Sequence, residues 1–216
     1  MNSRAQSGPL IAAVLLGIVT YIIACATTGM QRSERTGATM KTVEQDFRQA
    51  IAQVDATRAS LEDLIRPGQA DVKKAFKLYS SSVNKMEDLG KRLFEHADKM
   101  SAQGKEYFEE WQKDGNTYKN PEIRALSEQR HADLSAVFAK VPEASVGVKG
   151  AFQAYMSDIR EIQTYLSNDL TPKGVEAITP TARKAMKDGD NLKESVAPVL
   201  SAIGTARAEF AHGGTE

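Results

Sequence analysis

Two pairs of glutamate and histidine are the residues of this sequence best suited to chemistry by type and spacing. Glu128 stands three positions before His131, and Glu209 stands three positions before His212. Helical bundles that hold two iron ions present Glu-x-x-His pairs from two of their helices toward the interior. If the last two long segments of the chain pair antiparallel about residue 170, Glu128 faces His212. His131 then faces Glu209, and the four residues become candidate metal ligands.

The apolar pattern around the second pair argues against a metal site. Glu209 and His212 flank the seam that carries Ala206 and Phe210, and His212 directly precedes Gly213. A function has to be argued from the site itself and not from a spacing shared with another fold. We therefore expect no metal and no cofactor, with a metal-binding, di-iron-like bundle as the alternative.

Other catalytic arrangements do not occur in the sequence. The three histidines lie far apart, and neither a glycine-rich phosphate loop nor a nucleophile elbow is present. The 28 basic and 28 acidic residues balance, which is unlike the basic surface of a nucleic-acid-binding protein. We therefore expect no catalytic residue, no enzymatic activity and no nucleic-acid partner.

Cys25 is the single cysteine of the chain and follows an apolar segment. A basic start precedes an apolar run over residues 10–23, which has the length typical of a secretory signal peptide. Ile22, Ile23 and Ala24 lead into Cys25, and this string resembles the lipobox of bacterial lipoproteins. The resemblance implies a signal peptide over residues 1–24 and a lipid on Cys25, which would anchor the protein in a membrane.

The residues next to Cys25 bear on which membrane holds the anchor. In lipoproteins of double-membraned bacteria, an aspartate directly after the cysteine resembles an inner-membrane retention signal, and here Ala26 occupies that place. We therefore expect an anchor in the outer membrane, facing the periplasm, with a flexible tether over residues 25–39. The alternative is an uncleaved N-terminal anchor in the inner membrane, because the apolar run approaches the roughly 20 residues that span a bilayer.

Beyond residue 40 the apolar residues recur at the three-and-four spacing of a helical heptad. Residues 72–111 fill every such position without a break, and the pattern resumes over 148–166 and over 175–210. The first segment places these residues on its seam: Phe47, Ile51, Val54, Arg58, Leu61 and Ile65. The pattern predicts an all-α, elongated antiparallel helical bundle or coiled coil of about four long helices over residues 40–212, with a frayed tail over 213–216.

Proline, glycine and asparagine mark the ends of these helices. Corners are expected near residues 67, 115 and 170, with Asn120 capping a helix that starts at Pro121. Pro142 predicts a break near Gly147, and Thr179 before Pro180 has the pattern of a helix start.

Small residues stand at heptad positions where large ones would be expected. Gly90, Ala97 and Gly104 follow one another at seven-residue spacing, and Gly189 lies on the last seam. We expect close helix packing at these four positions. If a second copy supplied the neighbouring helix, the protein would be a homo-oligomer.

Four strings of residues resemble the bacterial family catalogued as domain of unknown function 2959. They cover residues 107–111, 120–130, 157–166 and 168–174. The resemblance implies a secreted helical protein and supplies no functional residues. Together with the lipobox, it leads us to expect a non-enzymatic, lipid-anchored envelope protein. Its helical rod would act as a periplasmic scaffold, spacer or partner-binding module, with the membrane and an unidentified envelope protein as partners.

Overall fold

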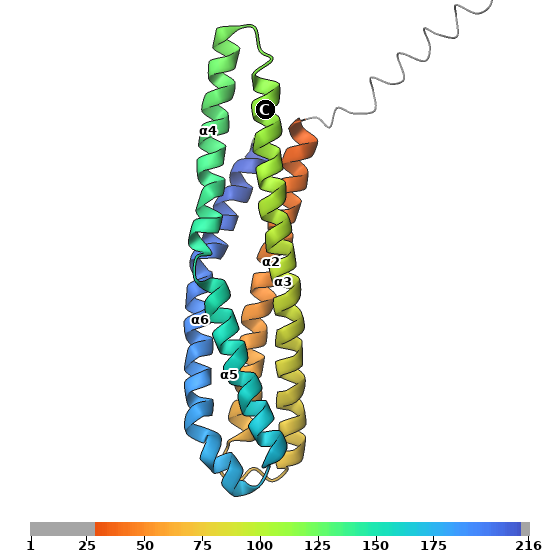
Figure 1. Cartoon of the computed structure of the whole chain (residues 1–216), viewed down its shortest axis with the longest axis vertical. Coiled ribbons are helices and arrows are strands. Elements are labelled where there is room, and N and C mark those ends of the chain that lie inside the picture. Colours follow the sequence, from red (N-terminus) through yellow and green to blue (C-terminus); the bar gives the residue numbers. More distant parts are fainter. Residues whose placement is uncertain (1–28, 213–216) are drawn as a thin grey trace, which may run out of the picture.

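The computed structural model describes residues 29–212, and these form five helices arranged as four antiparallel arms (Figure 1). The helices are α2 (Gly29–Leu64), α3 (Val72–Gly115), α4 (Pro121–Ala144), α5 (Val148–Asn168) and α6 (Pro172–His212). α4 and α5 follow one another along the third arm, and residues 29–212 contain no strand. The predicted all-α antiparallel bundle is therefore confirmed.

The two ends of the bundle differ in what they contain. At one end lie the turns from α2 to α3 and from α5 to α6, and we call it the corner end (Figure 1). At the other lie the α3–α4 turn, the start of α2 and the end of α6, and we call it the terminal end. Among the helices that the structure describes, none is long and apolar enough to cross a bilayer. The predicted signal peptide, Cys25 and the frayed tail lie outside the described residues.

The core runs along the whole bundle because every arm contributes a buried seam. Tyr79, Val83, Met86 and Leu93 of α3 are buried as the heptad predicts. So are the six seam residues of α5, which are Val148, Phe152, Tyr155, Ile159, Ile162 and Leu166.

The seam of α2 is rotated relative to the sequence prediction. From Met40 onward its buried seam positions are Met40, Val43, Phe47, Ala50, Val54, Thr57, Leu61 and Leu64. Ile51 and Ile65 are only partly buried at the edge of the core, and Arg58 lies outside it. Arg58 instead forms ion pairs with Glu62 at 2.9 Å and with Asp190 of α6 at 2.5 Å. The prediction failed at these positions because two of the eight seam residues, Ala50 and Thr57, are small and give little hydropathy signal.

The predicted flexible tether is wrong for residues 29–39, which form the first three turns of α2. Threonine hydroxyls there donate to carbonyl oxygens four residues earlier, as Thr36 does to Arg32 at 3.0 Å. Thr36 is 2% exposed, and the Ser33 hydroxyl donates to the Phe210 carbonyl oxygen at 3.0 Å. Contacts with other arms therefore stabilise a helix whose own sequence lacks apolar periodicity.

The start of α6 lies eight residues before the predicted one. Thr171 caps the helix, since its hydroxyl oxygen accepts from the Gly174 amide at 3.2 Å, and Pro172 occupies the first helical position. Thr179 and Pro180 repeat the same dipeptide inside the helix, where the Thr179 hydroxyl donates to the Val175 carbonyl oxygen. At the other predicted starts and breaks, Asn120 caps α4 and Gly147 separates α4 from α5.

Phenylalanine rings of the third arm occupy the space beside two glycines of α3. A Cβ added to Gly90 would lie closer than 3.0 Å to the Phe152 ring, and one added to Gly104 would meet the Phe138 ring as closely. The two glycines are two heptads apart, and so are the two phenylalanines. α3 and the third arm therefore keep one register on both sides of the break at Gly147.

Two other small residues that the sequence singled out also face the core. Gly189 of α6 packs against Tyr155 and Val54, and a Cβ there would lie 3.0 Å from each. Ala97 is partly buried against the same core. Because rings of the same chain cover Gly90 and Gly104, a homo-oligomer would have to form through another surface.

Candidate functional site

Three of the four candidate metal ligands, Glu128, His131 and Glu209, have described side chains, and these do not form a metal site; the His212 side chain lies outside the described part of the structure. The antiparallel register is close to the expected one, because Arg130 of α4 contacts Glu209 of α6 at 3.5 Å. His131 faces α3, and its Nε2 lies 3.2 Å from the Phe108 carbonyl oxygen. Glu128 is exposed on the outside of α4. Among the side chains that the structure describes, no group of three could hold a metal ion, so the geometry gives the di-iron-like alternative no support.

A groove at the terminal end is wide enough to bind another molecule. It encloses about 1020 Å³ between the start of α2, the end of α3, the first half of α4 and the end of α6. We call it the terminal groove. Its lining includes Met30, Arg32, Lys41, Tyr107, Trp111, Tyr118, Arg130, Arg207 and Phe210. The groove thus combines aromatic and basic side chains.

Aromatic rings form the floor of the terminal groove. Tyr107 packs edge to face on Trp111, with ring centroids 5.7 Å apart, and lies 5.2 Å from the Phe210 ring of α6. Trp111 Nε1 donates to the Ser127 hydroxyl at 2.9 Å, which ties α3 to α4. The His131 ring packs edge to face on the Trp111 ring, with ring centroids 5.8 Å apart. Burial raises the pKa of the Tyr107 hydroxyl, partly offset by a hydrogen bond with Ser33, so Tyr107 is neutral near pH 7.

Arginines on the walls of the groove are held by carboxylates from neighbouring helices. Arg32 of α2 contacts Asp114 at 2.6 Å and Glu110 at 3.4 Å, both on α3. Arg207 of α6 pairs with Glu44 of α2, and the hydrogen bond from Arg48, together with Arg207, lowers the pKa of the Glu44 carboxyl. These contacts fix the four arms relative to one another. The groove is thus a preformed surface suited to binding, with its guanidinium groups held in place by carboxylates.

A buried acidic residue between α2 and α3 was missed by sequence reasoning. Asp46 is 5% exposed, and its carboxylate accepts from Arg92 Nε at 3.1 Å and lies 2.5 Å from His96 Nδ1. Arg92 also donates to Gln49 at 2.6 Å. The available signal was the position of Asp46 directly before Phe47 on the buried seam. Because a buried carboxylate needs partners, this cluster fixes the α2–α3 register.

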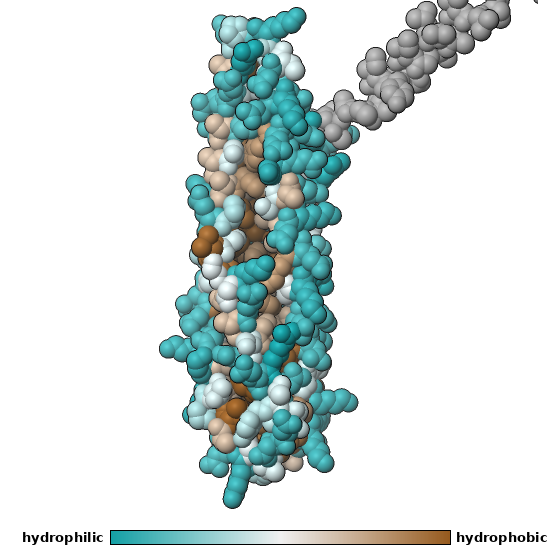
Figure 2. Space-filling model, viewed as in Figure 1, coloured by the Kyte–Doolittle hydropathy of each residue, from teal (hydrophilic) through white to brown (hydrophobic). Residues whose placement is uncertain are grey.

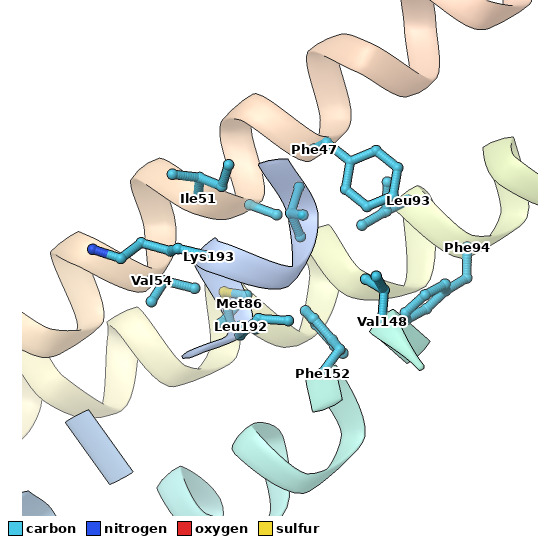
Figure 3. Close-up of a pocket in the computed structure, with 12 residues that line it drawn as sticks. Phe47, Ile51, Val54, Met86, Leu93, Phe94, Val148, Phe152, Leu192 and Lys193 are labelled. Carbon is cyan, nitrogen blue, oxygen red and sulfur yellow. The ribbon is translucent and has the colours of Figure 1, made fainter. Parts of the chain in front are cut away.

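The interior of the bundle offers no room for a substrate at its middle. An apolar cavity of about 10 Å³ lies where α2, α3, α5 and α6 meet, with Phe47, Met86 and Phe152 around it (Figure 3). A cavity needs about 10–15 Å³ to hold one water molecule. The ammonium group of Lys193 points away from this cavity, toward Asp55 at 2.6 Å and Asp190 at 3.1 Å, and these carboxylates raise its pKa.

The outer surface is mostly hydrophilic. Figure 2 shows charged and polar side chains over most of one face, with a strip of apolar side chains between α4 and α3. The residues expected to direct lipidation, which are Ile22, Ile23, Ala24 and Cys25, precede the described part of the chain. The described helix nearest to them, α2, starts at Gly29, beside the terminal groove.

Comparison with known proteins supports the resemblance found in the sequence. No curated protein and no solved structure matched the chain. A model for a protein family of unknown function, DUF2959, matches residues 23–208, which include all of α2 to α5 and most of α6. The chain therefore belongs to the DUF2959 family of proteins of unknown function.

Proposed function

We propose that this protein is a lipid-anchored envelope protein whose helical rod acts as a periplasmic scaffold, spacer or partner-binding module. The observation that carries the proposal is the position of α2, which begins four residues after Cys25. A chain of four residues spans at most about 14 Å. A lipid on Cys25 would thus hold the terminal end of the rod close to the membrane and let the rest extend into the periplasm.

The dimensions and rigidity of the bundle support the role of a spacer or scaffold. α3 has 44 residues, and at about 1.5 Å per residue it is about 66 Å long. Ion pairs join the arms along this length, including Arg32 with Asp114 and Arg58 with Asp190. A continuous core and these ion pairs between arms favour a stiff rod. The terminal groove favours a binding role at one end.

The anchor is tested by the mass of the N-terminal peptide of the protein purified from membranes. We expect a chain that starts at Cys25 and carries diacylglyceryl and a third acyl chain. Cys25→Ser should leave the leader uncleaved and remove the acyl chains, whereas the matched Ala26→Ser variant should be processed normally. A chain that starts at Met1 with an unmodified Cys25 would contradict the proposal.

The scaffold or binding role is tested by crosslinking in intact cells. The anchored protein should give a discrete crosslinked product with an envelope protein. Cys25→Ser should lose that product, because the variant lacks the lipid that places the rod at the outer membrane. Crosslinks to lipid alone would leave the anchor in place and reject a protein partner.

A further inference from the structure

The terminal end carries several exposed apolar side chains that the core does not explain. In the described residues, seven large hydrophobic side chains are exposed, and four of them lie at this end. These are Met30, Tyr118, Ile123 and Leu126, with exposed fractions of 58%, 38%, 50% and 72%. Exposed apolar residues that gather at one place mark an interaction surface.

The reason for the exposure is that the α3–α4 hairpin extends past the other two arms. Arg32 near the start of α2 contacts Asp114, so the turn after Asp114 lies beyond α2. Arg130 contacts Glu209 close to the end of α6, so the first turns of α4 lie beyond α6. Figure 1 shows this hairpin projecting at the terminal end. We call residues 116–126 the hairpin tip.

The hairpin tip has the side-chain chemistry of a membrane interface. Ile123 and Leu126 are three positions apart and share one face of α4. Tyr118 combines an apolar ring with a polar hydroxyl, which suits the headgroup level of a bilayer. Exposed Lys119 and Arg124 flank these residues, and Arg124 donates to the Tyr118 carbonyl oxygen at 2.7 Å. Basic side chains at the headgroup level of a bilayer attract lipid phosphates.

From this arrangement we infer that the hairpin tip docks on the lipid bilayer that holds the anchor, so the rod stands on the membrane at two points. The inference rests on the proposed lipidation of Cys25. Because at most about 14 Å separates Cys25 from the start of α2, the anchor brings the tip to the lipid surface. One lipid anchor leaves the rod free to tilt, and a second contact through Ile123 and Leu126 fixes its orientation.

The test places a fluorophore at the tip of the lipidated full-length protein in vesicles of phosphatidylethanolamine and phosphatidylglycerol. Cys25 is the single native cysteine and its sulfur is alkylated in the anchored form, so Leu126→Cys supplies the one reactive thiol. Leu78→Cys toward the corner end and Val146→Cys in the middle are matched controls, since both native side chains are exposed. Ile123→Cys repeats the measurement on the same face.

We expect the label at positions 126 and 123 to shift its emission to shorter wavelength and to lose most of its fluorescence to brominated lipid. Labels at 78 and 146 should keep theirs. If vesicles float with the protein and all four labels stay in water, the inference is overturned while the anchor stands. Labels in lipid at every position would mean a rod lying flat, which also overturns it. Protein that does not float and has an unmodified Cys25 rejects the anchor and the inference together.

Discussion

α3 and the third arm face each other along the bundle, yet they are built in opposite ways. α3 is one unbroken helix of 44 residues with glycines on its seam, whereas the third arm is split into α4 and α5 and carries phenylalanines. The Phe138 and Phe152 rings lie where Gly104 and Gly90 lack a side chain. The long helix supplies the spaces, and the broken arm supplies the rings that occupy them.

This comparison explains how a break can be tolerated in a long bundle. Gly147 has a φ of 85°, which lets the chain turn between α4 and α5 and start the next helix in register. Phe138 before the break packs beside Gly104, and Phe152 after it packs beside Gly90. These two glycines are two heptads apart on α3. The register of the third arm is thus held by side-chain packing at two points and not by a continuous backbone helix.

Removing a ring should have the largest effect on stability. Phe152 is 7% exposed and packs edge to face on Phe94 at 5.3 Å. Phe152→Ala leaves a cavity beside Gly90, and we expect a loss of about 3–5 kcal/mol in the free energy of unfolding. Urea denaturation followed by circular dichroism measures it. If Phe152→Ala loses no more free energy of unfolding than Leu78→Ala at an exposed position, the Phe152 ring does not stabilise the packing of the third arm on α3.

Adding a methyl group on the other side of the same contact should have the next largest effect. Gly104→Ala gains helix propensity but pushes the new Cβ into the Phe138 ring, so we expect a net loss of about 1–2 kcal/mol. Gly204→Ala is the matched control, because nothing lies within 4 Å of its Cβ position in α6. That variant should gain about 0.5–1 kcal/mol.

A double variant separates the ring contact from other effects of the glycine. Phe138→Leu shortens the side chain that meets Gly104, so it should recover part of the stability that Gly104→Ala loses. Losses that simply add would show that the two positions are independent.

The break itself is tested by Gly147→Ala. Alanine at a φ of 85° is strained, so we expect a loss of about 1 kcal/mol without a change in helix content. Gly150→Ala, three residues later in α5 with nothing within 4 Å, is the control and should be neutral or stabilising. A stabilised Gly147→Ala variant would mean that the third arm can become one continuous helix.

The sequence predicted the features that depend on neighbours along the chain. The seams of α3 and α5, the cap at Asn120 and the break near Gly147 all follow from spacing or from the backbone limits of proline and glycine. It could not predict the helix over residues 29–39, whose support comes from Phe210 and Asp114, far away in the chain. Thr171–Pro172 and Thr179–Pro180 look alike as helix starts, but Thr171 caps the helix through the Gly174 amide and Thr179 lies inside it. The sequence also did not predict that His131 faces α3, where its Nε2 lies near the Phe108 carbonyl oxygen.

The last expected effect on stability, comparable to that of Gly147→Ala, concerns a hydrogen bond that joins α3 to the third arm. The Tyr79 hydroxyl of α3 is buried and donates to the Ile159 carbonyl oxygen of α5 at 2.7 Å. Tyr79→Phe removes this bond, and we expect a loss of about 0.5–1.5 kcal/mol at neutral pH. Tyr165→Phe, at a more exposed hydroxyl of α5, is the control and should change the stability little.

The same hydroxyl gives the bundle a pH dependence whose sign follows from its burial. Burial raises the pKa of Tyr79 far above its ordinary value of 10.0, so the folded protein keeps a proton that the unfolded chain releases. The stabilisation is therefore complete below about pH 10 and is lost as the pH rises above that value. The free energy of unfolding is measured by denaturation at several values between pH 9 and pH 11, about the range where phenols ionise. It should fall with rising pH in the native sequence and fall less steeply in Tyr79→Phe. An unchanged slope would place the alkaline sensitivity at another group, with Tyr155 the first to test because burial raises its pKa as well.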